Sequence, residues 1–101
     1  MTYWVVGTNI ISRKALNDFA ETHPDARDAL IAWYAVVRKS EFANFAEVQA
    51  TFATASWVNP DYVIFNIRGN HYRLITRVNF QFKTVWIKHV LTHVEYDRWK
   101  P

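Results

Sequence analysis

The chain has 101 residues, of which 50% are hydrophobic and 17% aromatic; this composition excludes a disordered protein and suits one domain that buries roughly 60 to 70 per cent of its unfolded surface. It has no cysteine, which excludes a disulfide framework and a thiolate zinc site and makes a reducing cytoplasm the simplest location. The net charge of +3 and the pI of about 9.4 predict an acidic partner, either nucleic acid or an acidic protein.

The first part of the chain predicts a short strand followed by two helices. Residues 9–11 form the predicted strand, and Ser12 is a candidate N-cap for a helix that runs to Thr22. Pro24 suits the first turn of a second helix, and acidic residues follow it. Apolar residues at helical spacing continue that helix to the basic residues 38–39, which suit the negative end of the helix dipole.

The second half predicts a shorter helix and then three strands. The helix begins near Asn44. Runs of aromatic and β-branched residues predict strands at residues 62–67, 71–80 and 84–92, with turn chemistry at residues 68–70. The short connections favour an antiparallel meander. The predicted fold class is therefore α+β, a compact domain with N-terminal helices packed on a small antiparallel β-sheet.

The alternation of side chains along these strands selects the residues that could meet a ligand. In the second strand Leu74 belongs to the set that packs under the helices, which leaves Arg73 and Arg77 on the other, open face. In the third strand His89 belongs to the more apolar set, so we expect it to be partly core and Lys88 to share the open face with Arg73. Guanidinium groups on such a face match phosphate oxygens in pairs.

Four segments carry a recognisable pattern: residues 11–16 (ISRKAL), 23–26 (HPDA), 63–75 (VIFNIRGNHYRLI) and 89–97 (HVLTHVEYD). Together they resemble the HigB family of bacterial toxins. HigB toxins belong to the RelE-like group, whose members are compact α+β endonucleases that cut messenger RNA within the ribosome and are neutralised by a cognate antitoxin. The resemblance implies a RelE-like fold and a toxin that inhibits translation.

The resemblance covers residues 9–101, which we interpret as the toxin domain. Family members usually begin close to the ISRKAL segment, so residues 1–8 are interpreted as an N-terminal extension. Residues 1–6 are apolar, but polar side chains follow from Asn9, too soon for a secretory signal or a membrane span. We therefore expect a cytoplasmic protein that does not associate with a membrane.

The resemblance also implies roles for individual residues. Arg73 falls on the recurrent active-site arginine of RelE-like toxins and would clamp the scissile phosphate. His93 and Tyr96 fall in the C-terminal region from which related toxins supply a proton-handling side chain. Together with the basic residues of the open face, the segment before Arg73 provides the predicted RNA contacts: Arg68, Asn70, His71, Arg77 and Lys88.

The implied chemistry requires neither a metal nor a cofactor. The 2′-hydroxyl of the RNA attacks the adjacent phosphorus, so the protein must remove one proton, return another to the leaving oxygen and stabilise the phosphorane. An imidazole such as His93, with an ordinary pKa of about 6.5, suits either proton transfer. The spacing of His89 and His93, with Glu95 nearby, is not a metal motif, because residues four apart meet on a helix and not on an extended strand.

Each of these residues also has a structural interpretation. Arg73 could pair with a surface carboxylate, His93 could be a hydrogen-bonded residue at a strand end, and Tyr96 could cover the core with its ring. The alternative function is a non-catalytic basic module that binds RNA or a protein. For the toxin, the expected partners are a HigA-like helix-turn-helix antitoxin, messenger RNA and the ribosome, with DNA contacted only through the antitoxin.

Overall fold

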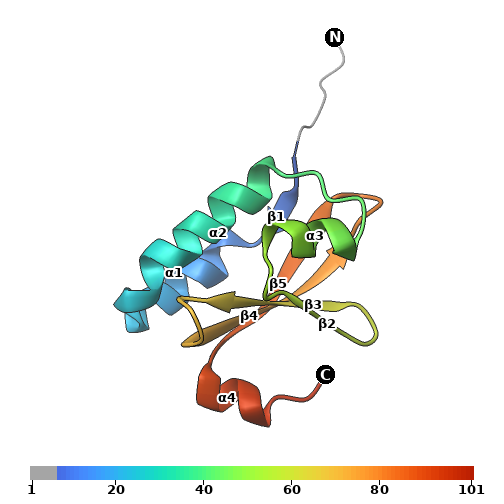
Figure 1. The fold of residues 1–101 in the computed structure, drawn as a ribbon. Coiled ribbons are helices and arrows are strands. Elements are labelled where there is room, and N and C mark those ends of the chain that lie inside the picture. Colours follow the sequence, from blue (N-terminus) through green and yellow to red (C-terminus); the bar gives the residue numbers. More distant parts are fainter. Residues whose placement is uncertain (1–6) are drawn as a thin grey trace.

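The computed structural model describes residues 7–101 and contains one layer of helices, a five-stranded sheet and a C-terminal helix on the other side of that sheet (Figure 1). Within the described residues, no helix has the length and apolar character needed to cross a membrane. In chain order the elements are β1 (Asn9–Ile11), α1 (Arg13–Thr22), the 3₁₀ turn η1 (Pro24–Ala26), α2 (Arg27–Lys39), α3 (Phe45–Thr51), β2 (Ser56–Val58), β3 (Tyr62–Ile67), β4 (Tyr72–Asn79), β5 (Thr84–Thr92) and α4 (His93–Arg98).

The helices form where local sequence signals predict them. In the N-cap position of α3, the side-chain oxygen of Asn44 accepts a hydrogen bond from the backbone N–H of Glu47 at 3.0 Å, which satisfies one of the free N–H groups of the first turn. The last turn of α2 carries Arg38 and Lys39, whose positive charge complements the helix dipole. Ser12 occupies the N-cap position of α1, without a side-chain hydrogen bond.

The predicted extension, residues 1–8, lies mostly outside the described residues. Gly7 and Thr8 are described and lie against the C-terminal end of α2. The backbone N–H of Thr8 donates to the carbonyl of Arg38 at 3.0 Å, and its hydroxyl donates to the carbonyl of Ser40 at 2.7 Å. The chain is therefore fixed to the helical layer immediately before β1 begins.

The sheet has the strand order β1-β5-β4-β3-β2. The strands β2, β3, β4 and β5 form the antiparallel part, whereas β1 pairs with β5 in parallel. The α+β class is thus confirmed, but the sheet is mixed, and the short edge strand β2 was not predicted. A parallel pair needs a long crossover connection, which the helices and the strands between β1 and β5 provide.

The main hydrophobic core lies between the sheet and the layer formed by α1, α2 and α3. Trp33 of α2 is only 2% exposed and packs edge-on against Phe65 of β3, with ring centroids 5.3 Å apart. Phe52, after α3, meets the same ring at 5.1 Å. Leu74 of β4 is completely buried in this cluster, as the alternation along the strand predicts.

The opposite face of the sheet is covered at one end by α4 (Figure 1). This helix was not predicted, although its start has a clear signature in the sequence. The hydroxyl of Thr92 accepts from the N–H of Glu95 at 3.2 Å, and the Glu95 carboxylate accepts from the N–H of Thr92 at 2.8 Å. Such a capping box follows the pattern Thr-x-x-Glu. His93, Tyr96 and Asp97 of the C-terminal segment therefore lie on a helix, not at the end of a strand.

Strand β5 contains an irregularity that changes which side chains face the helices. Ile75 pairs with His89, but the next residue, Thr76, pairs with Ile87, so Lys88 is an extra residue in β5. One extra residue reverses the alternation beyond it. His89 consequently lies on the face away from the main core and is exposed. The prediction that His89 is partly core is wrong, because it assumed strict alternation through this bulge.

Replacing the core residue Leu74 by alanine should lower the free energy of unfolding by about 2 to 5 kcal/mol, because it removes buried contacts and leaves a cavity. Urea unfolding followed by circular dichroism measures this loss. Phe82, which is 70% exposed in the β4–β5 turn, provides the control, and Phe82→Ala should change the stability by only about 0.5 kcal/mol. Equal losses for the two variants would contradict the placement of Leu74 in the core.

Candidate functional site

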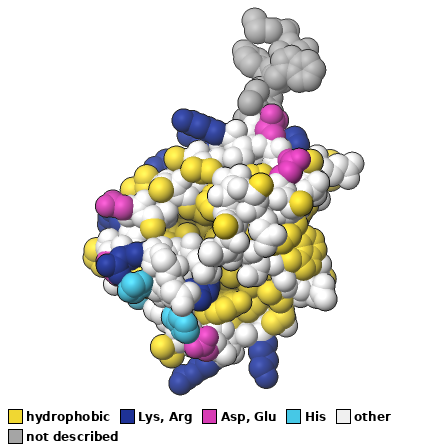
Figure 2. Space-filling view, viewed as in Figure 1, with side chains coloured by type: hydrophobic (Ala, Val, Ile, Leu, Met, Phe, Trp, Pro, Cys, Tyr) yellow, Lys and Arg dark blue, Asp and Glu magenta, His cyan; other side chains and the backbone are white. Residues whose placement is uncertain are grey.

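Three histidines border a shallow hollow at the end of the sheet, where the β3–β4 turn meets the β5–α4 junction. His23 follows α1, His71 precedes β4 and His93 is the first residue of α4. The backbone N–H of His93 donates to the carbonyl of His71 at 3.0 Å and joins the two segments. Figure 2 shows histidine side chains close together below the helical layer, with basic and acidic side chains beside them. This histidine hollow is lined by His23, Asn70, His71, Tyr72, Thr92, His93 and Val94.

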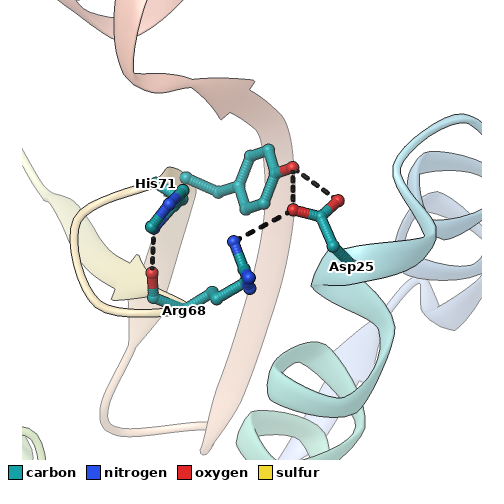
Figure 3. Close-up of polar contacts among 4 residues, drawn as sticks. Asp25, Arg68 and His71 are labelled. Atoms are coloured by element: carbon teal, nitrogen blue, oxygen red, sulfur yellow. Dashed lines mark hydrogen bonds and ion pairs between the residues drawn. The ribbon is translucent and has the colours of Figure 1, made fainter.

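Asp25 connects the helical layer to the β3–β4 turn beside the hollow (Figure 3). The hydroxyl of Tyr72 donates to both Asp25 carboxylate oxygens, at 2.7 and 2.8 Å, and Nη1 of Arg68 lies 3.2 Å from one of them. The Tyr72 hydrogen bond, with the charge of Arg68 in support, lowers the pKa of Asp25. The same hydrogen bond raises the pKa of Tyr72. Arg68, a predicted RNA contact, is therefore already paired with a carboxylate.

His71 is oriented by the turn that precedes it. Its Nδ1–H donates to the carbonyl of Arg68 at 2.9 Å (Figure 3), since a carbonyl oxygen can only accept. Arg68 and Gly69 supply the tight turn with φ angles of 51° and 61°, the left-handed region that favours glycine. With Nδ1 occupied, Nε2 of a neutral His71 ring is the nitrogen that can accept a proton.

His93 is oriented by the first turn of α4. Its Nδ1 lies 3.2 Å from a carboxylate oxygen of Asp97, four residues later, and the His93 side chain is 46% exposed. The carboxylate favours the ring tautomer with its proton on Nδ1, so that Nε2 carries the lone pair. A solvent-accessible imidazole held in this way can take up or release a proton in the hollow.

Arg73 lies on the face predicted for it, but that face is not open at this point. Its side chain is only 9% exposed, and its Cζ atom lies 5.3 Å from the centre of the Tyr96 ring on α4. Nη1 donates to the carbonyls of Asn70 and Tyr72 at 3.1 and 3.2 Å, and Nη2 donates to the Asn70 side chain at 2.6 Å. The predicted open face is thus corrected: α4 folds back over the sheet and covers the guanidinium.

The structure brings some predicted residues together and separates others. Arg73 and Tyr96 are in contact, and Asn70 joins them to the histidine hollow because it both binds Arg73 and lines the hollow. Arg77 and Lys88 instead border a second hollow, together with Asp61, Val78, Asn79 and Trp86. Lys88 is therefore on the same sheet face as Arg73, but beside Arg77, at the end of that face away from the histidine hollow.

Arg77 is held by Asp61. Nε and Nη2 of Arg77 donate to the two carboxylate oxygens of Asp61, both at 2.9 Å, a two-point geometry that only arginine can make. This pairing raises the pKa of Arg77. The Arg77 charge is consequently balanced by that of Asp61.

The sequence interpretation missed His23 and Tyr72, which line the histidine hollow, and Asp25, which binds Tyr72 beside it. His23 and Asp25 belong to the HPDA segment, which was read as the end of one helix and the start of the next. Tyr72 is two residues before Leu74, so alternation along β4 predicts it in the core as well, and it is buried at 8% exposure. Its hydroxyl nevertheless reaches Asp25, as the polar end of a buried tyrosine usually finds a partner. The resemblance at HPDA was the available signal.

The chemistry that these residues can perform is proton transfer and charge stabilisation. Imidazoles and a phenol line the histidine hollow, the Asp25 carboxylate binds that phenol, and the Arg73 guanidinium is joined to the hollow through Asn70. Among residues 7–101, no group of three or more histidine, aspartate or glutamate side chains has an arrangement that could hold a metal ion.

Comparison with known proteins gives consistent matches. The model of the HigB toxin family, described as the RelE-like toxic component of a toxin-antitoxin system, matches residues 26–99. The mRNA interferase toxin HigB of Escherichia coli strain K12 is 33% identical over 92 residues, which span 88% of each chain. The mRNA interferase HigB of Escherichia coli O6:H1 is 30% identical over 93 residues and 89% of each chain.

Among solved structures, the archaeal RelE-RelB complex from Pyrococcus horikoshii OT3 contains a similar chain. The TM-score is 0.53 at 12% sequence identity, and the match covers 89% of this chain and 97% of that chain. At this level of identity the likeness concerns the fold alone.

Replacing Tyr72 by phenylalanine should raise the pKa of Asp25 toward its ordinary value of about 3.9, because the strongest hydrogen bond to the ionised carboxylate is lost. Because the Asp25 pKa is lower in the folded than in the unfolded protein, the ionised carboxylate stabilises the fold at pH values above the unfolded-state pKa. This stabilisation is lost as the pH falls through the folded-state pKa. The variant should therefore lose stability at neutral pH, and the loss should shrink in acid.

Carbon-13 NMR titration of the Asp25 carboxyl group measures the shift directly. Tyr62, at the far end of β3, supplies the control, and Tyr62→Phe should leave the Asp25 titration unchanged. An unaltered Asp25 midpoint in Tyr72→Phe would show that the hydroxyl does not stabilise the carboxylate.

Proposed function

The chain belongs to the HigB family of RelE-like toxins, and on this basis we propose that it is an endoribonuclease that cleaves messenger RNA and inhibits translation. Its relatives in Escherichia coli are named mRNA interferases. The observation that carries the proposal is the position of His93, whose exposed ring is oriented by Asp97 at the rim of the histidine hollow.

In the proposed reaction the 2′-hydroxyl of the RNA attacks the neighbouring phosphorus, and no metal ion takes part. Nε2 of His93 accepts the hydroxyl proton while the P–O bond to the next nucleotide breaks, and that leaving oxygen receives a proton. Tyr96 is our candidate for positioning or donating this second proton. An imidazole in such a role contributes about a hundred- to ten-thousandfold in rate.

Arg73 is proposed to stabilise the charge that develops on the phosphorane. Three of the five guanidinium N–H groups are used by Asn70 and Tyr72 among the described residues, which leaves two for a substrate. Asn70 lines the hollow and also binds Arg73, so we propose that a phosphate in the hollow reaches these two N–H groups beside Asn70. A preorganised donor of this kind is worth about a hundredfold or more.

Arg68, Asn70 and His71 are proposed to contact the RNA backbone from the β3–β4 turn. Arg68 is 46% exposed although it is paired with Asp25, so a phosphate can approach it from the solvent side. His71 is exposed at the rim of the hollow. The site is shallow and holds few groups, which is why we propose that the ribosome positions the RNA. Correct positioning can remove about 7 to 11 kcal/mol from a barrier.

The family is defined as the toxic component of a toxin-antitoxin system, so an antitoxin is the partner of this chain. We propose a HigA-like antitoxin with a helix-turn-helix domain, through which the complex contacts DNA only indirectly. The net charge of +3 favours an acidic surface on that partner. Cleavage of messenger RNA would place the active toxin in the cytoplasm.

The alternative function is a basic module that binds RNA or a protein without cleaving RNA. Its support is the near burial of Arg73 and the three hydrogen bonds of its guanidinium, which also suit a purely structural arginine. The two functions differ in whether cleavage can be measured and in whether His93 is needed for it.

Replacing His93 by alanine should reduce messenger-RNA cleavage by about a hundred- to ten-thousandfold, because the proton acceptor is lost while the fold is kept. Primer extension on transcripts from ribosome-containing reactions measures the cuts. His89→Ala is the matched control, since His89 is also an exposed histidine and lies on β5 outside the hollow. Full cleavage by His93→Ala would contradict the proposed mechanism. Separately, if the unaltered protein cuts naked RNA as efficiently as ribosome-bound RNA, the proposed dependence on the ribosome is wrong.

Replacing Arg73 by lysine tests the buried guanidinium, because lysine keeps the charge but not the planar fork. We expect cleavage to fall by about a hundredfold, measured per folded molecule after the folded fraction is determined by circular dichroism. Arg13→Lys is the control, since Arg13 also lies over a tyrosine ring, that of Tyr34, but in the helical layer away from both hollows. If Arg73→Lys lowers only the melting temperature and cleaves normally, Arg73 is structural.

A further inference from the structure

One row of side chains crosses four strands on the sheet face that carries α4, at the end of β4 far from the histidine hollow. Tyr62 of β3 pairs with Arg77 of β4, Arg77 pairs with Trp86 of β5, and Trp86 pairs with Ile11 of β1. Directly paired residues point to the same face of a sheet. Arg77 and Trp86, in the middle of this row, line the second hollow, which we call the Trp86 hollow.

Part of this row is held rigidly. Arg77 is fixed by its two hydrogen bonds to Asp61 and lies over the Tyr62 ring, with Cζ 5.5 Å from the ring centre. Tyr62 in turn meets Trp99, which follows α4, at a centroid distance of 5.3 Å. The C-terminal segment therefore supports one side of the row.

Trp86 and Lys88 remain accessible beside this rigid part. The Trp86 side chain is 37% exposed, and Lys88 is exposed on the bulge of β5. Trp86 and Lys88 are two residues apart, so alternation along β5 places their side chains on the same face, and both line the hollow. No carboxylate is paired with Lys88 in the described part of the chain.

We propose that the Trp86 hollow is a second RNA subsite, in which one nucleobase stacks on Trp86 and the adjacent phosphate binds Lys88. This inference rests on the proposed ribonuclease function. An exposed aromatic ring beside an uncompensated cation is the combination that binds single-stranded nucleic acid, because every base has a face that stacks. Asp61 balances Arg77, so the remaining positive charge of the hollow is that of Lys88.

The position of the subsite suits a single-stranded RNA that continues past the cleaved bond. Tyr72 at the histidine hollow and Arg77 at the Trp86 hollow are five positions apart on β4, which corresponds to about 17 Å along an extended strand. A few nucleotides can span that distance. The subsite would therefore hold RNA to one side of the scissile bond and increase affinity without taking part in proton transfer.

Binding of a fluorescein-labelled, 2′-O-methylated single-stranded RNA, which cannot be cleaved by its own 2′-hydroxyl, tests the subsite by fluorescence anisotropy. Trp86→Ala should weaken binding by about five- to hundredfold, the effect of losing one stacked base. Trp57→Ala is the matched control, because Trp57 is 42% exposed but packs against Phe45 on the helical side. It should bind RNA as the unaltered protein does.

Two further variants keep the test valid if Trp86→Ala folds poorly. Trp86→Phe retains an aromatic face and should bind RNA more tightly than Trp86→Ala. Lys88→Gln should lower the dependence of log Kd on log salt concentration by about 0.7, the value for one phosphate contact with a single strand. Unchanged RNA affinity and salt dependence in all three variants would overturn the subsite.

The outcomes also separate this inference from the proposed function. Cleavage by the full chain with normal RNA binding by Trp86→Ala would overturn the subsite and leave the ribonuclease function intact. Weaker RNA binding by Trp86→Ala in a chain that never cleaves RNA would support the subsite and overturn the ribonuclease function. Loss of affinity for the antitoxin alone, with RNA binding unchanged, would identify the hollow as a protein contact and overturn the subsite.

Discussion

The reciprocal hydrogen bonds between Thr92 and Glu95 end β5 and begin α4, and the candidate site depends on this change of direction. If the chain continued as a strand, Tyr96 would not lie over Arg73, and His93 would not face Asp97 across one helical turn. The capping box satisfies two free N–H groups at once. It therefore fixes the start of a short helix that has no fully buried residue of its own.

A second link, between Asp25 and Tyr72, joins the helical layer to the same end of the sheet. The two residues are 47 positions apart in the sequence, so their contact forms only after α1, α2 and the β3–β4 hairpin have packed together. The carboxylate receives its hydrogen bonds in the ionised state, which is why its pKa is lowered. Through this contact His23 comes to lie beside His71 and His93.

The basic residues of the sheet and its turns differ in whether a carboxylate balances their charge, and this difference decides where positive charge remains on the surface. Arg68 and Arg77 are each paired with an aspartate, and Arg73 is enclosed by backbone carbonyls, Asn70 and an aromatic ring. Lys88 belongs to neither group. A chain with only a modest excess of positive charge can in this way concentrate its unbalanced positive charge at a few surface positions. The arginines near these positions are held in place by their hydrogen bonds.

The sequence by itself determined the three long strands, the three N-terminal helices and the face on which Arg73 lies, because these follow from side-chain periodicity over a few residues. It also contained the capping box of α4, a local signal that strand-like residues before it obscured. Only the tertiary structure decided that β1 joins β5 in parallel, that Lys88 forms a bulge and that Asp25 binds Tyr72. These features depend on which distant segments meet and on how their side chains pack, and no short window of sequence contains that information.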